Sequence, residues 1–239
     1  MNRELIGIIG AMSVEIEDLR QALLDAKEEI ISGMTFYTGK LNGKNVVLAL
    51  SGVGKVNAAM CAQTMILRYA PSAILNTGVA GGLQKGVRVG DIVIADAVVQ
   101  YDMDTSAIGD PIGFVSGVNR IDFPSDKSVA DRLHRAAEAL ADTNVHRGII
   151  ATGDRFISSS SEAAVIRERF LAVANEMEGG SIGQVCYINE IPFCVVRAIS
   201  DSEDDSSHME YVQFVEIAAK KSKAIVLGYL AGTASGGTD

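Results

Sequence analysis

The feature that most constrains this sequence is the regular alternation of short, β-branched apolar runs with longer segments of helical periodicity. The strand-like runs lie at 6–9, 73–76, 91–99, 147–152, 172–177 and 193–199, and the helical segments at 13–24, 55–69, 126–140, 161–169, 180–189 and 209–230. Strands that alternate with crossover helices predict a mostly parallel sheet, because right-handed βαβ connections join parallel neighbours. We therefore expect an α/β fold.

One hairpin interrupts this alternation. Residues 35–41 and 45–50 are strand-like and are joined by Asn42-Gly43, a pair that favours the positive φ angles of a tight turn. The sheet is therefore expected to be mixed. No linker divides the chain, so we expect one domain over residues 1–231 and a flexible, Gly/Ser/Thr-rich tail at 232–239.

Charge and cysteine content exclude several classes of protein. The net charge is −9 and no cluster of Lys or Arg occurs, which argues against nucleic-acid binding. The apolar run near the N-terminus is too short for a signal peptide or a membrane span. Cys61, Cys186 and Cys194 lack the spacing of a disulfide framework or zinc site, which predicts reduced thiols in the cytoplasm.

In sheets of this class, ligands bind beyond the carboxyl ends of the strands. Five segments follow predicted strands, at 10–15, 77–82, 153–157, 175–178 and 197–201. The first carries Glu15 in the first turn of a helix, where it is either a catalytic base or a partner of the helix dipole. The Gly-rich segment 77–82 is predicted as a loop, which either holds a ligand or only connects two elements. In the third, Phe156 either stacks on a base or belongs to the core.

The last two segments concentrate charge. Glu176 and Glu178 flank Met177 at a strand end, and a carboxylate there is suited to accept both hydroxyls of a ribose. Alternation along the final strand places Arg197 and Asp201 on one side, as either a structural ion pair or catalytic groups. The convergence of several acids at one sheet edge is the main argument for an active site.

Two common kinds of catalytic centre are absent from the sequence. His134, His146 and His208 are scattered and none belongs to an H-E-x-x-H motif, so no zinc site is predicted. A G-x-S-x-G nucleophile turn is also absent.

Six motifs occur in an order that resembles one enzyme family, the 5′-methylthioadenosine/S-adenosylhomocysteine nucleosidases of the nucleoside phosphorylase superfamily. They are residues 7–12 with Glu15, 51–55, 76–82, 89–92, 176–178 and 197–201. The resemblance implies a three-layer α/β sandwich with a mixed, mostly parallel central sheet flanked by helices. It also implies a homodimer, no metal or organic cofactor, and hydrolysis of the N-glycosidic bond to release adenine.

The resemblance assigns roles to individual residues. Asp201, held by Ser200, would deliver a proton to N7 of adenine, and Glu15 would deprotonate the attacking water that Arg197 helps to place. Glu178 would bind the 2′ and 3′ hydroxyls. The substrate-binding set implied by the resemblance is Met12, Val53, Val79, Ile108, Phe156, Ile157, Glu176, Met177, Glu178, Arg197, Ser200 and Tyr211.

Within this set, two positions depart from the family pattern. Val79 stands where members often carry Ser, and Ile108, which would reach the partner subunit's site, stands where Phe is commoner. The alternatives are a 6-amino-6-deoxyfutalosine or 5′-deoxyadenosine hydrolase, a purine nucleoside phosphorylase, and a non-catalytic nucleoside-binding domain. The chemistry favours catalysis, because a departing adenine needs an acid and the cationic sugar benefits from nearby anions.

Overall fold

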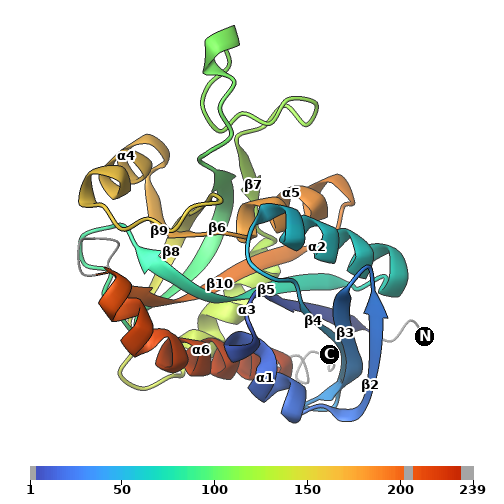
Figure 1. Cartoon of the computed structure of the whole chain (residues 1–239). Helices are drawn as coiled ribbons and strands as arrows, with labels where there is room; N and C mark the ends of the chain where they lie inside the picture. Colours follow the sequence, from blue (N-terminus) through green and yellow to red (C-terminus); the bar gives the residue numbers. More distant parts are fainter. Residues whose placement is uncertain (1–3, 202–206, 233–239) are drawn as a thin grey trace, which may run out of the picture.

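The computed structural model describes residues 4–201 and 207–232 (Figure 1). The strands are β1 (Leu5–Gly10), β2 (Leu24–Ile31), β3 (Met34–Leu41), β4 (Lys44–Leu50), β5 (Ala73–Gly82), β6 (Ile92–Gln100), β7 (Asp122–Pro124), β8 (Val145–Thr152), β9 (Ala172–Glu176) and β10 (Phe193–Asp201). The helices are α1 (Ser13–Gln21), α2 (Lys55–Tyr69), η1 (Ser106–Ile108), α3 (Lys127–Glu138), α4 (Ser160–Phe170), α5 (Gly179–Ile188) and α6 (Ser207–Gly232).

The strands form one mixed sheet in the order β10-β6-β8-β9-β5-β1-β4-β3-β2, with β7 paired to β6. Because β10 also pairs with β5, five of these strands close into a ring, a feature that the sequence pattern did not predict. β1 runs parallel to β4 and β5, and β5 runs parallel to β10. The carboxyl ends of β1, β5 and β10 therefore lie at one edge of the sheet.

Helices cover both faces of the sheet, which confirms the predicted three-layer α/β architecture (Figure 1). α1, α3 and α6 cover one face, where Ile16, Leu133 and Ile225 enter a buried apolar cluster. α2 and α5 cover the other face through a second cluster that includes Cys61 and Ile182. Among the described residues, no helix is both long and apolar enough to cross a membrane.

The first helix is shorter than predicted. The expected helix extended to Leu24, but α1 ends at Gln21 and Leu24 begins β2, a strand that the sequence pattern missed. Among the described strands, β2 pairs with β3 alone, and it is largely exposed, so its Lys and Glu residues resemble the polar face of a helix. Here the pairing with β3 overrides local propensity. The hairpin between β3 and β4 agrees with the prediction, with positive φ at Asn42 and Gly43.

Residues 77–82 were predicted as a loop, and this prediction is wrong. They continue β5 to Gly82, because β10 pairs along β5 and β9 pairs with its last two residues. Gly78 shows why glycine is needed in this stretch: a Cβ there would lie 2.5 Å from Oε1 of Glu15. The glycines thus allow close approach of a side chain to a strand, where the sequence suggested a turn.

The predicted long loop at 102–124 is mainly irregular and contains η1 and β7. Figure 1 shows it as an arm that projects from the body of the molecule. Ile108 lies on this arm and is 81% exposed. At the other end of the chain, α6 includes Gly232, and the rest of the expected tail, 233–239, lies outside the described residues.

Candidate functional site

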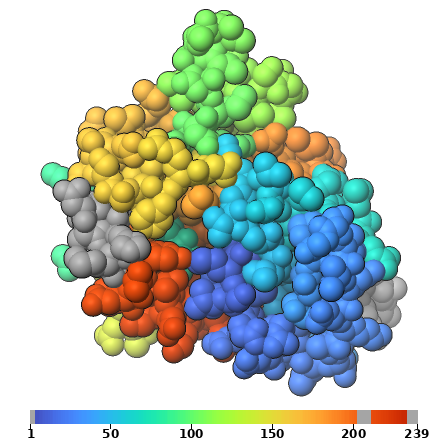
Figure 2. Space-filling view, viewed as in Figure 1, coloured from blue at the N-terminus to red at the C-terminus, as the bar shows by residue number. Residues whose placement is uncertain are grey.

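A cleft of roughly 550 Å³, including its open mouth, lies at the carboxyl ends of the strands. Figure 2 shows the hollow where the loop before α4, the start of α2, the start of α1 and α6 meet. Twelve residues of the predicted set line it: Met12, Glu15, Val53, Val79, Phe156, Ile157, Glu176, Met177, Glu178, Ser200, Asp201 and Tyr211. Arg197 and Ile108 do not line it.

Glu15 forms one wall of the cleft. Its Oε2 accepts hydrogen bonds from the backbone N–H groups of Ala11 (2.7 Å) and Met12 (3.0 Å), and its Oε1 accepts one from Val79 (3.1 Å). The side chain therefore caps its own helix, as the dipole interpretation expected, and also reaches β5. Glu15 is only 5% exposed, and this burial raises the pKa of its carboxyl against the opposing effect of Arg197.

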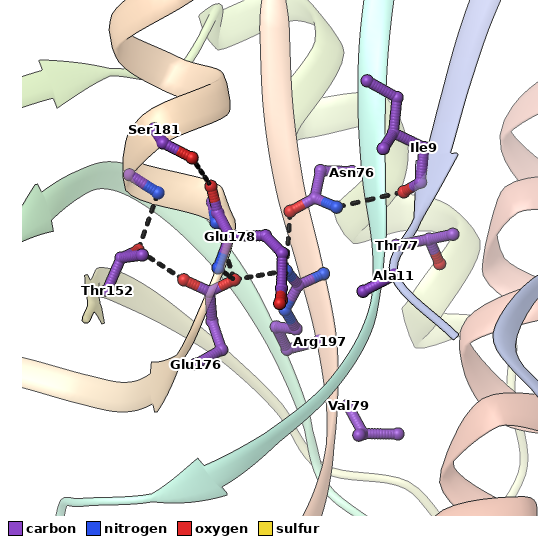
Figure 3. Close-up of polar contacts among 12 residues, drawn as sticks. Ile9, Ala11, Asn76, Thr77, Val79, Thr152, Glu176, Glu178, Ser181 and Arg197 are labelled. Carbon is purple, nitrogen blue, oxygen red and sulfur yellow. Dashed lines mark hydrogen bonds and ion pairs between the residues drawn. The ribbon is translucent and has the colours of Figure 1, made fainter. Parts of the chain in front are cut away.

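Arg197 is a buried cation that lies between Asn76 and the carboxylates of Glu176 and Glu178 (Figure 3). Its Nη2 donates to Glu176 and to Oδ1 of Asn76 (2.6 Å), and lies 3.6 Å from Oε2 of Glu178. Asn76 is fixed in turn, because its Nδ2 donates to the Ile9 carbonyl (3.0 Å). The ion pair expected for Arg197 is therefore present, and its partner is Glu176.

Glu176 has four hydrogen-bond donors from the protein. Besides Arg197, the hydroxyl of Thr152 donates to it, as do the backbone N–H groups of Glu178 (3.0 Å) and Gly179 (2.7 Å). These two N–H groups belong to the first turn of α5, so the carboxylate caps that helix. Glu176 lines the cleft, but its oxygens are occupied by protein partners.

Glu178 contrasts with Glu176 two residues earlier. Its Oε1 accepts one hydrogen bond, from the backbone N–H of Gly54 (2.9 Å) at the start of α2. Burial, together with the nearby charge of Glu176, raises the pKa of Glu178 to about 7, against the lowering effect of Arg197. The Glu178 carboxylate therefore keeps acceptor capacity for a ligand.

Asp201 and Ser200 reach the cleft together because the strand is irregular there. The pairing of β10 with β5 shifts register between Ile199 and Asp201, so the simple alternation that placed Asp201 with Arg197 is wrong. Arg197 turns to the buried cluster, whereas Asp201 and Ser200 line the cleft. The Ser200 hydroxyl donates to Oδ1 of Asp201 (2.8 Å), and Asp201 is only 2% exposed.

The mouth of the cleft is apolar. The rings of Phe156 and Tyr211 meet edge to face with centroids 5.7 Å apart, and the Tyr211 hydroxyl lies 3.2 Å from Sδ of Met12. The loop that carries Phe156 is tied to α2, because Oδ1 of Asp154 accepts from the Lys55 backbone N–H (2.7 Å). A planar ring and an apolar substituent both fit such a surface.

The sequence did not single out several contributors. Asn175, Ala80, Gly81, Ala11 and Arg155 also line the cleft. Thr152 and Asn76 hold Glu176 and Arg197 from neighbouring strands. Small polar residues inside strands carry no distinctive pattern, so only their position after a strand, as for Asn175, gave a signal.

The charge of the cleft is predominantly negative. Among the described lining residues, Glu15, Glu176, Glu178 and Asp201 are acidic, and the basic one, Arg155, pairs with Glu162 at 2.7 Å. No group of three or more His, Cys, Asp or Glu side chains in the described part of the chain is arranged to hold a metal ion. The site can therefore donate and accept protons and bind hydroxyl groups.

Comparison with known proteins gives a consistent result. The family model of the phosphorylase superfamily matches residues 5–231. A 5′-methylthioadenosine/S-adenosylhomocysteine nucleosidase of Haemophilus influenzae (strain 86-028NP) is 42% identical over 226 residues, which cover 94% of this chain and 97% of the relative.

Solved structures match equally well. The nucleosidase of Neisseria meningitidis in complex with methylthio-immucillin-A has a TM-score of 0.92 at 39% identity and covers 96% of this chain and 99% of its own. A futalosine hydrolase mutant of Helicobacter pylori has a TM-score of 0.91 at 31% identity, and the match covers 96% of this chain and 99% of that one.

Proposed function

Because the chain belongs to the phosphorylase superfamily and, within it, to the 5′-methylthioadenosine/S-adenosylhomocysteine nucleosidases, we propose that it hydrolyses the N-glycosidic bond of both nucleosides. The products are adenine and the 5-thio-substituted ribose. The observation that carries the proposal is the meeting of Glu15, Glu178 and Asp201, from three elements, in one cleft. Burying three carboxyl groups costs stability, so their retention supports a catalytic purpose.

Asp201 is the general acid in this proposal. When the bond between ribose and adenine breaks, its electron pair goes to the base, which leaves more readily once N7 is protonated. The Ser200 hydroxyl, which donates to Oδ1 of Asp201, helps to hold the carboxyl in the cleft. Phe156 packs on the plane of the base, and the Ile157 backbone binds its edge.

Glu15 and Glu178 act on the sugar side. Glu15 accepts a proton from the attacking water, whose oxygen then bonds to the anomeric carbon, and its raised pKa makes it a stronger base than an ordinary carboxylate. Glu178 accepts hydrogen bonds from the 2′ and 3′ hydroxyls, with the Met177 backbone beside them. Both carboxylates stabilise the cationic sugar of the transition state.

Glu176 and Arg197 have a supporting role in this scheme. Glu176 is held by Arg197, Thr152 and the start of α5, and Arg197 in turn lies 3.6 Å from Glu178. We assign both residues to positioning Glu178, and Arg197 alone to limiting the repulsion among the three glutamates. This assignment replaces a direct role for Arg197 in placing the water.

The 5′ substituent and the dimer belong to the same proposal. Met12, Val53 and Tyr211 form the apolar mouth that accepts the thioether. Ile108 lies far out on the arm, and its exposure supports a homodimer in which it completes the partner subunit's site. The three cysteines are free and buried, which supports a reducing, cytoplasmic location.

A second substrate class is 6-amino-6-deoxyfutalosine, favoured by the likeness to the Helicobacter pylori futalosine hydrolase mutant. The test is a panel assay of adenine release. Purified protein is incubated with 5′-methylthioadenosine, S-adenosylhomocysteine, 5′-deoxyadenosine and 6-amino-6-deoxyfutalosine, and kcat/KM is measured for each. The proposal expects the two thioethers to rank first, and it fails if neither releases adenine.

A further inference from the structure

Asn175 is a buried amide whose presence at the cleft the proposed mechanism does not explain. It lies in β9, is 4% exposed and lines the cleft. Among the described residues, its side-chain oxygen Oδ1 has no hydrogen-bond partner. A buried acceptor without a partner destabilises a folded protein, so such groups are uncommon unless a ligand or water satisfies them.

The pairing of the strands places Asn175 relative to Asp201. Gly81 of β5 pairs with Asn175 on one side and with Asp201 on the other. Residues in one row across a sheet point to the same face, so both side chains stand on the cleft side and flank a residue that has no side chain. Two strand spacings separate their backbones by roughly 10 Å.

This spacing suits a purine ring. A flat base that lies across Gly81 with its N7 edge toward Asp201 turns its opposite edge, with N3 and C2, toward Asn175. An amide offers both a donor and an acceptor, so it can donate to ring nitrogen N3 or accept from an amino group at C2. An apolar residue at this position could do neither.

We propose that Asn175 is a specificity-determining residue whose amide binds the purine edge remote from Asp201 and makes the site tolerant of an amino group at C2. This inference rests on the proposed function, because it takes Asp201 as the group at N7. It adds a class of substrate, the 2-aminopurine nucleosides with a 5′-thioether.

The test compares 5′-methylthioadenosine with its 2-amino analogue in the native protein and in Asn175→Val. The measured quantity is the ratio of kcat/KM for the 2-amino analogue to kcat/KM for 5′-methylthioadenosine. We expect Asn175→Val to lower this ratio about tenfold, because the 2-amino group then loses its acceptor inside a buried site. The change should appear in KM and not in kcat, as for a contact present before and during the reaction.

The control is Asn144→Val, which removes an amide outside the cleft that donates to Asp91. It should leave the ratio unchanged. Thermal unfolding gives a second readout: because no described residue bonds to Oδ1 of Asn175, Asn175→Val should unfold at the same or a higher temperature than the native protein. A purely structural amide would instead lower the unfolding temperature.

The outcomes separate this inference from the proposed function. If the native protein releases adenine from 5′-methylthioadenosine and the ratio is the same in Asn175→Val, the inference is wrong and the function stands. A variant that is less stable, or that fails to fold, would also overturn the inference, because the amide would then be structural. If the native protein releases no adenine, both fail.

Discussion

The cleft and the projecting arm reverse the usual distribution of side chains in opposite ways. In the cleft, the acidic residues Glu15 and Asp201 are almost fully buried, whereas on the arm the large apolar residue Ile108 is 81% exposed. The surrounding protein stabilises the first region, through backbone N–H groups and Arg197. Nothing in the described chain covers Ile108 in the same way.

This difference indicates that a single chain forms the polar part of the cleft, whereas the arm is suited to contact another chain. The polar contacts of the cleft are largely internal, so its geometry is set when the chain folds. The arm has an exposed apolar residue that folding alone does not explain, which points to a surface for association.

The largest effect is expected for Asp201→Asn. The amide keeps the shape of the side chain but cannot supply a proton, so kcat should fall by about 10² to 10⁴. Adenine release is followed at saturating 5′-methylthioadenosine, with circular dichroism as the control for folding. A folded variant with near-native turnover would remove Asp201 from the role of acid.

Glu176→Gln should cost mainly stability. Removing the charge of Glu176 leaves the buried Arg197 with the more distant Glu178, at 3.6 Å, so the variant should lose up to about 3–5 kcal/mol of stability. The matched control is Glu17→Gln, which breaks an exposed, solvent-screened pair with Arg20 and should lose clearly less stability than Glu176→Gln. Denaturant unfolding measures both, and equal losses in the two variants would contradict the positioning role.

The pH dependence of stability should identify Glu178. Its pKa is raised from 4.5 to about 7 in the folded protein, so the folded state keeps this proton while the unfolded state loses it. The contribution of Glu178 to the free energy of unfolding should therefore decrease as pH rises from about 4.5 to about 7. The full shift corresponds to on the order of 3 kcal/mol.

Glu178→Gln removes this titration. The free energy of unfolding of the variant should therefore rise relative to that of the native protein across the same pH interval. The measurement is a series of denaturant unfolding curves for both proteins between pH 4.5 and 8. Parallel profiles would show that Glu178 does not titrate in this way.

The smallest effect is expected on the arm. Ile108→Ser should raise KM for 5′-methylthioadenosine up to about tenfold with little change in kcat, because a lost apolar contact of this size is worth about 1–2 kcal/mol. Sedimentation at the assay concentration, run on the native protein and the variant, reports the dimer. A fully active native monomer would contradict the contribution of Ile108 to a partner.

Sequence reasoning was most successful where a residue follows a strand. Glu15, Glu178 and Asp201 were placed at one sheet edge by this rule, and the structure brings all three to the same cleft. It failed where pairing decides the conformation: β2 has a helix-like composition, and residues 77–82 form a strand because two neighbours pair with them.

The internal contacts of the site were the least predictable part. The register shift near Ser200 changes the side to which Asp201 points, and no local pattern in the sequence marks it. Likewise, Thr152 and Asn76 act on Glu176 and Arg197 through tertiary contacts between distant strands. The fold determines which residues become such partners, and the periodicity of the sequence does not identify them.

The central claim is that water attacks the sugar, and the identity of the sugar product tests it most directly. A phosphate dianion within about 4 Å of the Glu15 carboxylate would be repelled by roughly 4 kcal/mol per charge pair at an effective dielectric of 20. Arg197, which lies beneath the cleft and is paired with Glu176, is poorly placed to offset this.

The protein is therefore incubated with 5′-methylthioadenosine in buffers with and without phosphate, and the sugar product is identified by mass spectrometry. We expect free 5-methylthioribose, formed at a rate that does not depend on phosphate. Accumulation of 5-methylthioribose 1-phosphate, at a rate that rises with phosphate concentration, would contradict it.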